Sequence, residues 1–157
     1  MTKLSKKLIK VGIVGPECTG KTSLAKSLSD LYKSDYVPEF ARIYAEQKIA
    51  KNRILTIDDV LPIADGQLDL VKKAESCAPN KNKDVLFFDT TLINTSVYAN
   101  MIYDYKSKYL DKLCYLEHYD IYLLTDYVDI KWVSDPGQRS GFDTRESQYD
   151  QIKNKLE

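Results

Sequence analysis

The sequence has no excess charge of either sign, because 23 lysines and arginines balance 23 aspartates and glutamates. A chain without net charge builds no field that would hold nucleic acid or an anionic membrane surface. Cysteine is scarce too, since Cys18, Cys77 and Cys114 form neither a CxxC pair nor a Cys/His cluster with metal-ligand spacing. These absences exclude a disulfide framework and a zinc site. They predict a cytoplasmic protein that binds neither nucleic acid nor membrane.

Long apolar runs are also missing. The run at 11–14 is too short for a signal-peptide core or a membrane span, and no other run comes closer. The chain has 157 residues, of which 43% are hydrophobic, so it can bury one sizeable core but not two. We therefore expect residues 1–157 to form a single domain.

Short apolar strands alternate with longer helical stretches, which predicts an α/β fold with a central parallel sheet. The first strand is nearly continuous in apolar residues, as a strand covered on both faces should be. Thr56 with Asp59 resembles a capping box and predicts the start of a helix. The Ser, Asp, Pro, Gly and Arg residues at 134–144 predict a loop. We expect strands at 8–14, 36–37, 85–88 and 121–124, and helices at 22–32, 40–51, 56–71, 92–105, 108–117 and 146–157.

The strongest chemical signal is the octapeptide Gly-Pro-Glu-Cys-Thr-Gly-Lys-Thr at 15–22, which matches GxxxxGK[ST], the P-loop pattern, at every fixed position. Gly15 and Gly20 permit positive φ angles, so backbone N–H groups can curl around phosphate oxygens. Lys21 would neutralise the β and γ phosphates of ATP, and Thr22 would offer its hydroxyl to Mg²⁺. We interpret Cys18 as a contributor of backbone N–H, the alternative being a redox switch. The expected nucleotide contacts are Gly15, Pro16, Glu17, Cys18, Thr19, Gly20, Lys21, Thr22 and Ser23.

Asp89 ends the apolar strand at 85–88, where P-loop proteins commonly place an acidic residue near magnesium or its waters. The alternative is a turn or capping residue, because a helix is expected to begin soon afterwards. The P-loop favours the magnesium role, so Thr22 and Asp89 are the predicted metal ligands.

Glu39 follows the second predicted strand and opens the next helix. Carboxyl ends of parallel strands face the phosphate site in this topology, so the Glu39 carboxylate would point towards the phosphoryl acceptor. A hydroxyl that attacks the γ phosphate needs orientation and a proton acceptor, and a carboxylate supplies both. Glu39 is therefore the predicted base. The alternative is a first-turn glutamate favoured by the helix dipole.

Two arginines, Arg139 and Arg145, are expected to lie in a flexible loop late in the chain. Arginines of this kind suit a lid that closes over the phosphates and stabilises charge in the transition state. The alternative for both is an ordinary surface position. We expect Arg139 to be catalytic, and both arginines to contact the nucleotide.

Five phrases together resemble the NadR-type nicotinamide riboside kinase domain and its AAA-type ATPase relatives. They lie at 15–22, 37–42, 63–67, 87–90 and 132–139, in the family's order. The resemblance covers nearly the whole chain and is more specific than the P-loop alone. It implies a P-loop NTPase fold, a kinase-like three-layer sandwich.

The resemblance also implies the activity, namely ATP-dependent phosphorylation of the ribosyl 5′-hydroxyl of nicotinamide riboside. The product would be nicotinamide mononucleotide, in NAD biosynthesis. On this resemblance Glu39 and Arg42 lie by the ribose and phosphates, and Asp89 serves magnesium. Trp132, with a tyrosine such as Tyr44, would stack on the pyridinium ring, since an aromatic face attracts a cationic ring. The alternative for Trp132 is a core anchor.

The sequence departs from the family pattern in three places. Lys131 replaces a usual proline, the turn at 135–137 is one residue longer, and the final strand and adenine-side loop are expected to be missing. Two other functions stay open: a kinase for another nucleoside or vitamin alcohol, and a regulatory nucleotide-binding ATPase module. The partner is expected to be a small nucleoside-type molecule. The sequence predicts neither the oligomeric state nor a preference between ATP and GTP.

Overall fold

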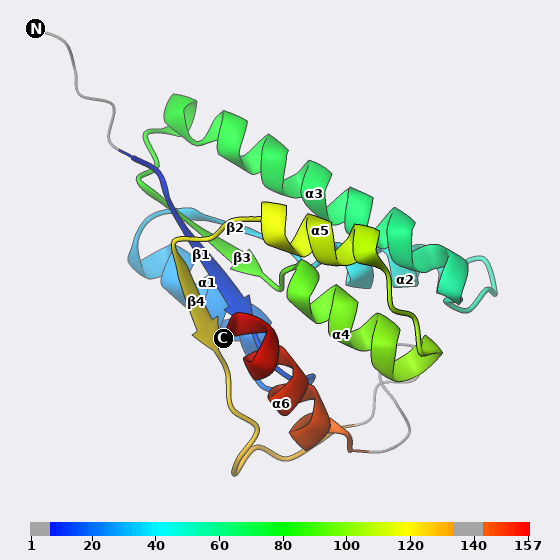
Figure 1. Ribbon diagram of the computed structural model, residues 1–157. Coiled ribbons are helices and arrows are strands. Elements are labelled where there is room, and N and C mark those ends of the chain that lie inside the picture. The colour runs from blue at the N-terminus through cyan, green and yellow to red at the C-terminus, as the bar shows by residue number, and fades with distance from the viewer. Residues whose placement is uncertain (1–6, 134–142) are drawn as a thin grey trace, which may run out of the picture.

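The computed structural model describes residues 7–133 and 143–157, and within them four parallel strands form one sheet in the order β2-β3-β1-β4 (Figure 1). The strands are β1 (Ile9–Val14), β2 (Asp35–Val37), β3 (Val85–Asp89) and β4 (Ile121–Leu124). The helices are α1 (Lys21–Leu31), α2 (Phe40–Ile49), α3 (Val60–Cys77), α4 (Leu92–Tyr103), α5 (Lys108–Leu116) and α6 (Arg145–Leu156), with 3-10 turns η1 (Ile57–Asp59) and η2 (Pro79–Lys81). The predicted α/β class is confirmed.

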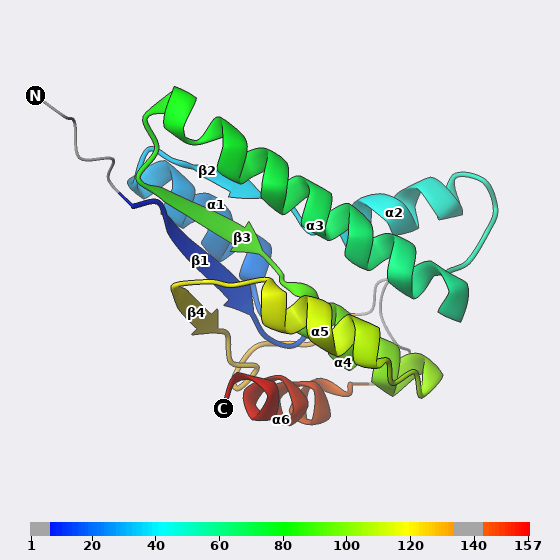
Figure 2. The same cartoon turned by 45° about the horizontal axis from the view of Figure 1, so that its top comes forward.

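Helices cover both faces of the sheet, and the side chains of β3 show why. Leu86 and Phe88 point into a core cluster with Val71 of α3, whereas Phe87 between them contacts the ring of Tyr32 at the end of α1, 5.6 Å between centroids. Successive side chains of a strand point to opposite faces, so an apolar run is buried on both sides. Figure 2 shows α1 behind the sheet and α3 in front of it.

A second group of helices packs beyond the carboxyl ends of the strands. α4 packs against α3, α5 and α6, and α6 lies alongside it in both views (Figures 1 and 2). Val14 at the end of β1, Ile93 and Val97 of α4 and Ile152 of α6 form one buried cluster. The helix at the end of the chain is therefore joined to the edge of the sheet where β1 ends.

The predicted elements are present, and two of their boundaries differ in an informative way. The Thr56–Asp59 capping box is formed, with the Thr56 N–H donating to Asp59 Oδ2 at 2.8 Å, but it opens the 3-10 turn η1 before α3 begins. α6 begins at Arg145, so this arginine is helical and not part of the predicted loop. In the part of the chain that the structure describes, no helix is long and apolar enough to cross a membrane.

Candidate active site

The P-loop connects the end of β1 to the start of α1, and its backbone has the predicted conformation. Gly15 has φ 146° and Gly20 has φ 80°. A Cβ on Gly15 would lie 2.1 Å from the Thr125 hydroxyl oxygen, so only glycine fits where the loop passes the end of β4. Cys18 also has a positive φ, 56°, and its thiol lies 3.5 Å from the carbonyl oxygen of Lys131. The thiol is thus directed to a neighbouring loop.

Thr22 and Asp89 meet beside the P-loop. The Thr22 hydroxyl donates to Asp89 Oδ2 at 2.6 Å, because the register of β1 and β3 pairs Ile13 with Asp89 and brings the two strand ends together. The second carboxylate oxygen, Oδ1, is buried and has no hydrogen-bond partner among the described residues. An unpartnered buried carboxylate oxygen is costly, and hard oxygen donors are the ligands that Mg²⁺ prefers. The pair therefore fits a magnesium ion that keeps waters and phosphate oxygens as its other ligands.

Glu39 stands at the N-cap position of α2, yet its side chain makes no capping hydrogen bond. The first N–H of the helix, that of Phe40, donates instead to Gln67 Oε1 of α3 at 2.8 Å. α2 and α3 approach closely here, since a Cβ on Gly66 would lie 2.0 Å from the Phe40 ring. Gly66 and Gln67 thus hold the start of α2, which leaves the Glu39 carboxylate to face the cavity.

The electrostatics around Glu39 join it to the phosphate-binding loop. The pKa of the Glu39 carboxyl is raised above its ordinary value, mainly because the group is buried. The nearby Lys21 ammonium opposes this rise, and the Asp89 carboxylate adds to it. Lys21 is only 8% exposed and donates from Nζ to the Pro16 carbonyl oxygen at 2.5 Å. Arg42 Nε lies 3.9 Å from Glu39 Oε2. Four predicted site residues, Lys21, Glu39, Arg42 and Asp89, therefore gather around one point.

A cavity of about 380 Å³ extends from this point. It is lined by the P-loop and the start of α1, by α2, by the segment before α3, by α3 itself and by α4. The sequence did not single out the α4 wall, whose lining residues are Thr95, Tyr98, Ala99, Ile102 and Tyr103. Their spacing of three and four residues was the available signal, because it marks one face of a helix. The lining of the cavity thus combines polar and cationic groups of the P-loop with apolar and aromatic side chains of α4.

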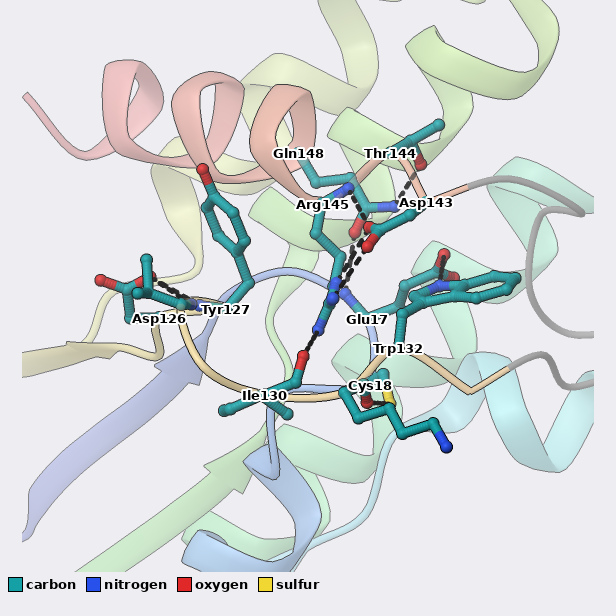
Figure 3. Close-up of polar contacts among 12 residues, drawn as sticks. Glu17, Cys18, Asp126, Tyr127, Ile130, Trp132, Asp143, Thr144, Arg145 and Gln148 are labelled. Atoms are coloured by element: carbon teal, nitrogen blue, oxygen red, sulfur yellow. Dashed lines mark hydrogen bonds and ion pairs between the residues drawn. The ribbon is translucent and has the colours of Figure 1, made fainter.

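The two aromatic residues proposed for ring stacking lie in different settings. Trp132 is half-buried beside the P-loop, and its indole Nε1 donates to Glu17 Oε1 at 3.2 Å (Figure 3). Tyr44 is not among the residues that line the cavity, and its hydroxyl donates to Asp59 Oδ1 at 2.8 Å. The structure therefore brings Trp132 to the P-loop, but neither Trp132 nor Tyr44 is among the residues that line the cavity.

Of the two lid arginines, Arg139 lies outside the described residues, and Arg145 is buried, with 6% of its surface exposed. The Arg145 guanidinium binds both carboxylate oxygens of Asp143, at 2.9 and 2.8 Å, and donates to the Ile130 carbonyl at 2.7 Å (Figure 3). The expectation that Arg145 lies in a flexible loop is wrong. As the first residue of α6, it fastens that helix to the segment after β4.

The family model of the AAA domain matches residues 10–157. The chain belongs to the AAA domain family. A search of curated proteins finds no match for this AAA domain.

Solved structures support the same fold. A NadR protein in complex with NR is 26% identical to this AAA domain, with a TM-score of 0.70 over 95% of this chain and 42% of that one. A NadR protein in complex with NAD and AMP-PNP is 23% identical, with a TM-score of 0.68, covering 95% and 41%. Thymidylate kinase from Ehrlichia chaffeensis is 16% identical, with a TM-score of 0.63, covering 96% and 79%. This AAA domain spans about two fifths of the length of the NadR chains.

These likenesses confirm the predicted P-loop, kinase-like fold and the resemblance to NadR. The two NadR structures are complexes, one with NR and the other with NAD and AMP-PNP. This site can hold a polyphosphate on backbone N–H groups and Lys21, a cation on two oxygen ligands, and a hydroxyl compound beside a carboxylate.

Proposed function

We propose that this AAA domain is an ATP-dependent small-molecule kinase that phosphorylates the ribosyl 5′-hydroxyl of nicotinamide riboside, giving nicotinamide mononucleotide. The observation that carries the proposal is the cavity, which P-loop residues, Glu39 and the aromatic side chains of α4 line together. A site with room for a donor phosphate and a second molecule suits transfer between them. The likeness to NadR supports the choice of acceptor.

In this proposal the P-loop holds the donor. Backbone N–H groups at 18–20 and the start of α1 bind phosphate oxygens, and Lys21 turns from the Pro16 carbonyl to the phosphates. Thr22 and Asp89 would hold magnesium, which neutralises charge on the phosphates when it is bound. Ser23 lines the cavity directly after Thr22, which fits its expected contact with the nucleotide.

Glu39 acts on the acceptor. The oxygen of the 5′-hydroxyl forms a bond to the γ phosphorus, the bond from that phosphorus to the β–γ bridging oxygen breaks, and the hydroxyl proton passes to the Glu39 carboxylate. A base works best when its pKa is near the working pH, and burial raises the pKa of Glu39 in that direction. The Lys21 charge limits this rise, so the carboxylate is available for the proton. Arg42 keeps its proposed place beside the ribose and phosphates.

The acceptor ring would lie against the α4 wall of the cavity. Tyr98 and Tyr103 supply aromatic surface on that wall, and Trp132, whose indole donates to Glu17, lies beside the P-loop. A pyridinium ring is cationic, so both aromatic faces and the Glu17 carboxylate would attract it. Arg139 stays our proposed lid arginine.

Two alternative functions make different predictions in one experiment. The protein is incubated with MgATP and, in separate reactions, nicotinamide riboside, a panel of nucleosides and no acceptor, while ADP and phosphorylated product are followed. The proposal predicts product from nicotinamide riboside. Product from another nucleoside alone would show that the protein is a kinase for a different acceptor. ADP formed in equal amounts without any acceptor would contradict the kinase activity and favour the regulatory ATPase.

A further inference from the structure

Gln148 of α6 is almost fully buried, with 2% of its surface exposed, and its amide touches three different segments. Its Oε1 accepts the backbone N–H of Glu17 in the P-loop at 2.8 Å and the hydroxyl of Tyr98 on α4 at 3.3 Å. Its Nε2 donates to the Thr144 hydroxyl at 2.9 Å. Figure 3 shows this side chain between Thr144 and Glu17. One oxygen atom thus joins the P-loop to the wall of the cavity.

The chemistry of the partners fixes the orientation of this amide. A backbone N–H can only donate, so the atom facing Glu17 has to be the oxygen, and a flipped amide would place two donors against each other. The buried Glu17 N–H has its partner in Gln148, and an unpaired buried N–H is costly. The hydrogen bond therefore constrains the shape of the loop at its third residue.

The loop is held in the same way at its first residue. Asn94 of α4, which is fully buried, donates from Nδ2 to the Gly15 carbonyl oxygen at 2.8 Å. Two amide side chains, from α4 and α6, thus bind the backbone of the P-loop at its first and third residues. A loop already held in its binding shape loses less entropy when a ligand binds.

We propose that Gln148 is a positioning residue that holds the P-loop in its phosphate-binding conformation and couples that loop to the cavity through Tyr98. The first part requires only that the P-loop binds a nucleotide. The coupling rests on the proposed function, in which Tyr98 lies against the acceptor. Neither part requires the acceptor to be known.

The structure offers a matched control on the same helix. Gln151 also joins α6 to α4, with its Oε1 accepting from Asn100 Nδ2 at 3.0 Å and its Nε2 donating to the Ser147 hydroxyl at 3.2 Å. Within the described residues, it makes no hydrogen bond with the P-loop. Gln148→Met and Gln151→Met each remove an amide from the interface of α4 and α6, but only the first removes the partner of the Glu17 N–H.

The test is the affinity of a non-hydrolysable ATP analogue with Mg²⁺, measured by calorimetry for both variants and the original chain. We expect Gln148→Met to bind the analogue about tenfold more weakly and Gln151→Met to stay within about twofold. Amide hydrogen exchange at Glu17 should accelerate in the first variant only. If Gln148→Met does not fold, Gln148→Ala, which leaves room for water, is measured in its place with the same expectation. Equal losses in both variants, or no loss at position 148, would overturn the proposal.

A double-mutant cycle tests the coupling through Tyr98. Tyr98→Phe should lower the affinity for the analogue by about threefold in the original chain and should not change it in the Gln148→Met background. If the two effects multiply, the coupling is refuted. Failure of the kinase proposal is recognised separately. A chain that binds the analogue but phosphorylates no acceptor would refute the kinase activity, whereas the role of Gln148 is decided by the binding measurements alone.

Discussion

Replacing Glu117 by glutamine should change how the stability of this domain depends on pH. Glu117 follows α5, is 5% exposed, and accepts the N–H of Leu92, the first residue of α4, at 2.7 Å. The Tyr119 hydroxyl donates to its other oxygen at 2.7 Å. Burial raises the pKa of Glu117 from 4.5 to about 7, although both hydrogen bonds and the charge of Lys10 oppose the rise.

The sign of the effect follows from proton linkage. The folded state holds this proton up to about pH 7, whereas the unfolded state releases it near pH 4.5, so the folded state binds more protons between these values. Unfolding therefore becomes easier as the pH rises through that window. With these two pKa values, Glu117 costs the folded state about 2.5 kcal/mol more at pH 8 than at pH 5. A glutamine has no proton to release and avoids this cost.

The assay is urea unfolding of the original chain and of Glu117→Gln at pH 5, 6, 7 and 8. We expect the free energy of unfolding of the variant, relative to that of the original chain, to rise by about 2.5 kcal/mol from pH 5 to pH 8, whatever the difference between the two at pH 5. Glu46→Gln, on the exposed surface of α2, is measured in parallel to report the effect of removing a surface carboxylate. If the difference in free energy of unfolding between Glu117→Gln and the original chain stays constant with pH, within about 0.5 kcal/mol, the raised pKa of Glu117 is refuted.

Three further predictions concern the site and its surroundings. Lys21→Ala should weaken nucleotide binding by at least about tenfold in calorimetry, whereas Lys26→Ala on the same helix should not; equal affinities would contradict the P-loop assignment. Glu39→Gln should lower kcat by about 10²–10⁴ while nucleotide affinity changes little, and intact turnover would remove Glu39 as the base. The pKa of Asp59 is lowered to about 2, so its ionised form stabilises the fold above pH 3.8 and this stability is lost as the pH falls towards 2. Asp59→Asn should thus be less stable than the original chain by about 2 kcal/mol at pH 7, and this difference in stability should disappear as the pH falls towards 2. A difference that does not change with pH would contradict the prediction.

The parts of the site that the sequence predicted are those fixed by local pattern. The P-loop glycines, Lys21 and Thr22 belong to one octapeptide, and Asp89 ends a strand whose apolar run is visible in the chain. Glu39 could be assigned to the site because the carboxyl ends of parallel strands share one edge of the sheet. These arguments need only the order and the direction of the elements.

The parts that the sequence did not predict depend on how distant helices pack. Gln148 lies 131 positions from the Glu17 N–H that it accepts, and nothing in a polar helix marks this glutamine among its neighbours. The face of α4 that carries Tyr98 and Tyr103 could not be distinguished in the sequence, because α4 is apolar on its other faces too. Tyr44 was expected at the acceptor, but its hydroxyl instead binds Asp59 of the capping box, a partner fifteen positions away. Rotation about a helix axis decides such cases, and a motif does not record it.

The central claim is that one site moves the γ phosphate of ATP to a hydroxyl in the cavity. The most direct measurement uses ATP labelled in its γ phosphate and follows the label after incubation with Mg²⁺ and nicotinamide riboside. The proposal predicts label in nicotinamide mononucleotide, and no such product from Lys21→Ala. Label found only in inorganic phosphate, in equal amounts with and without the riboside, would contradict the claim.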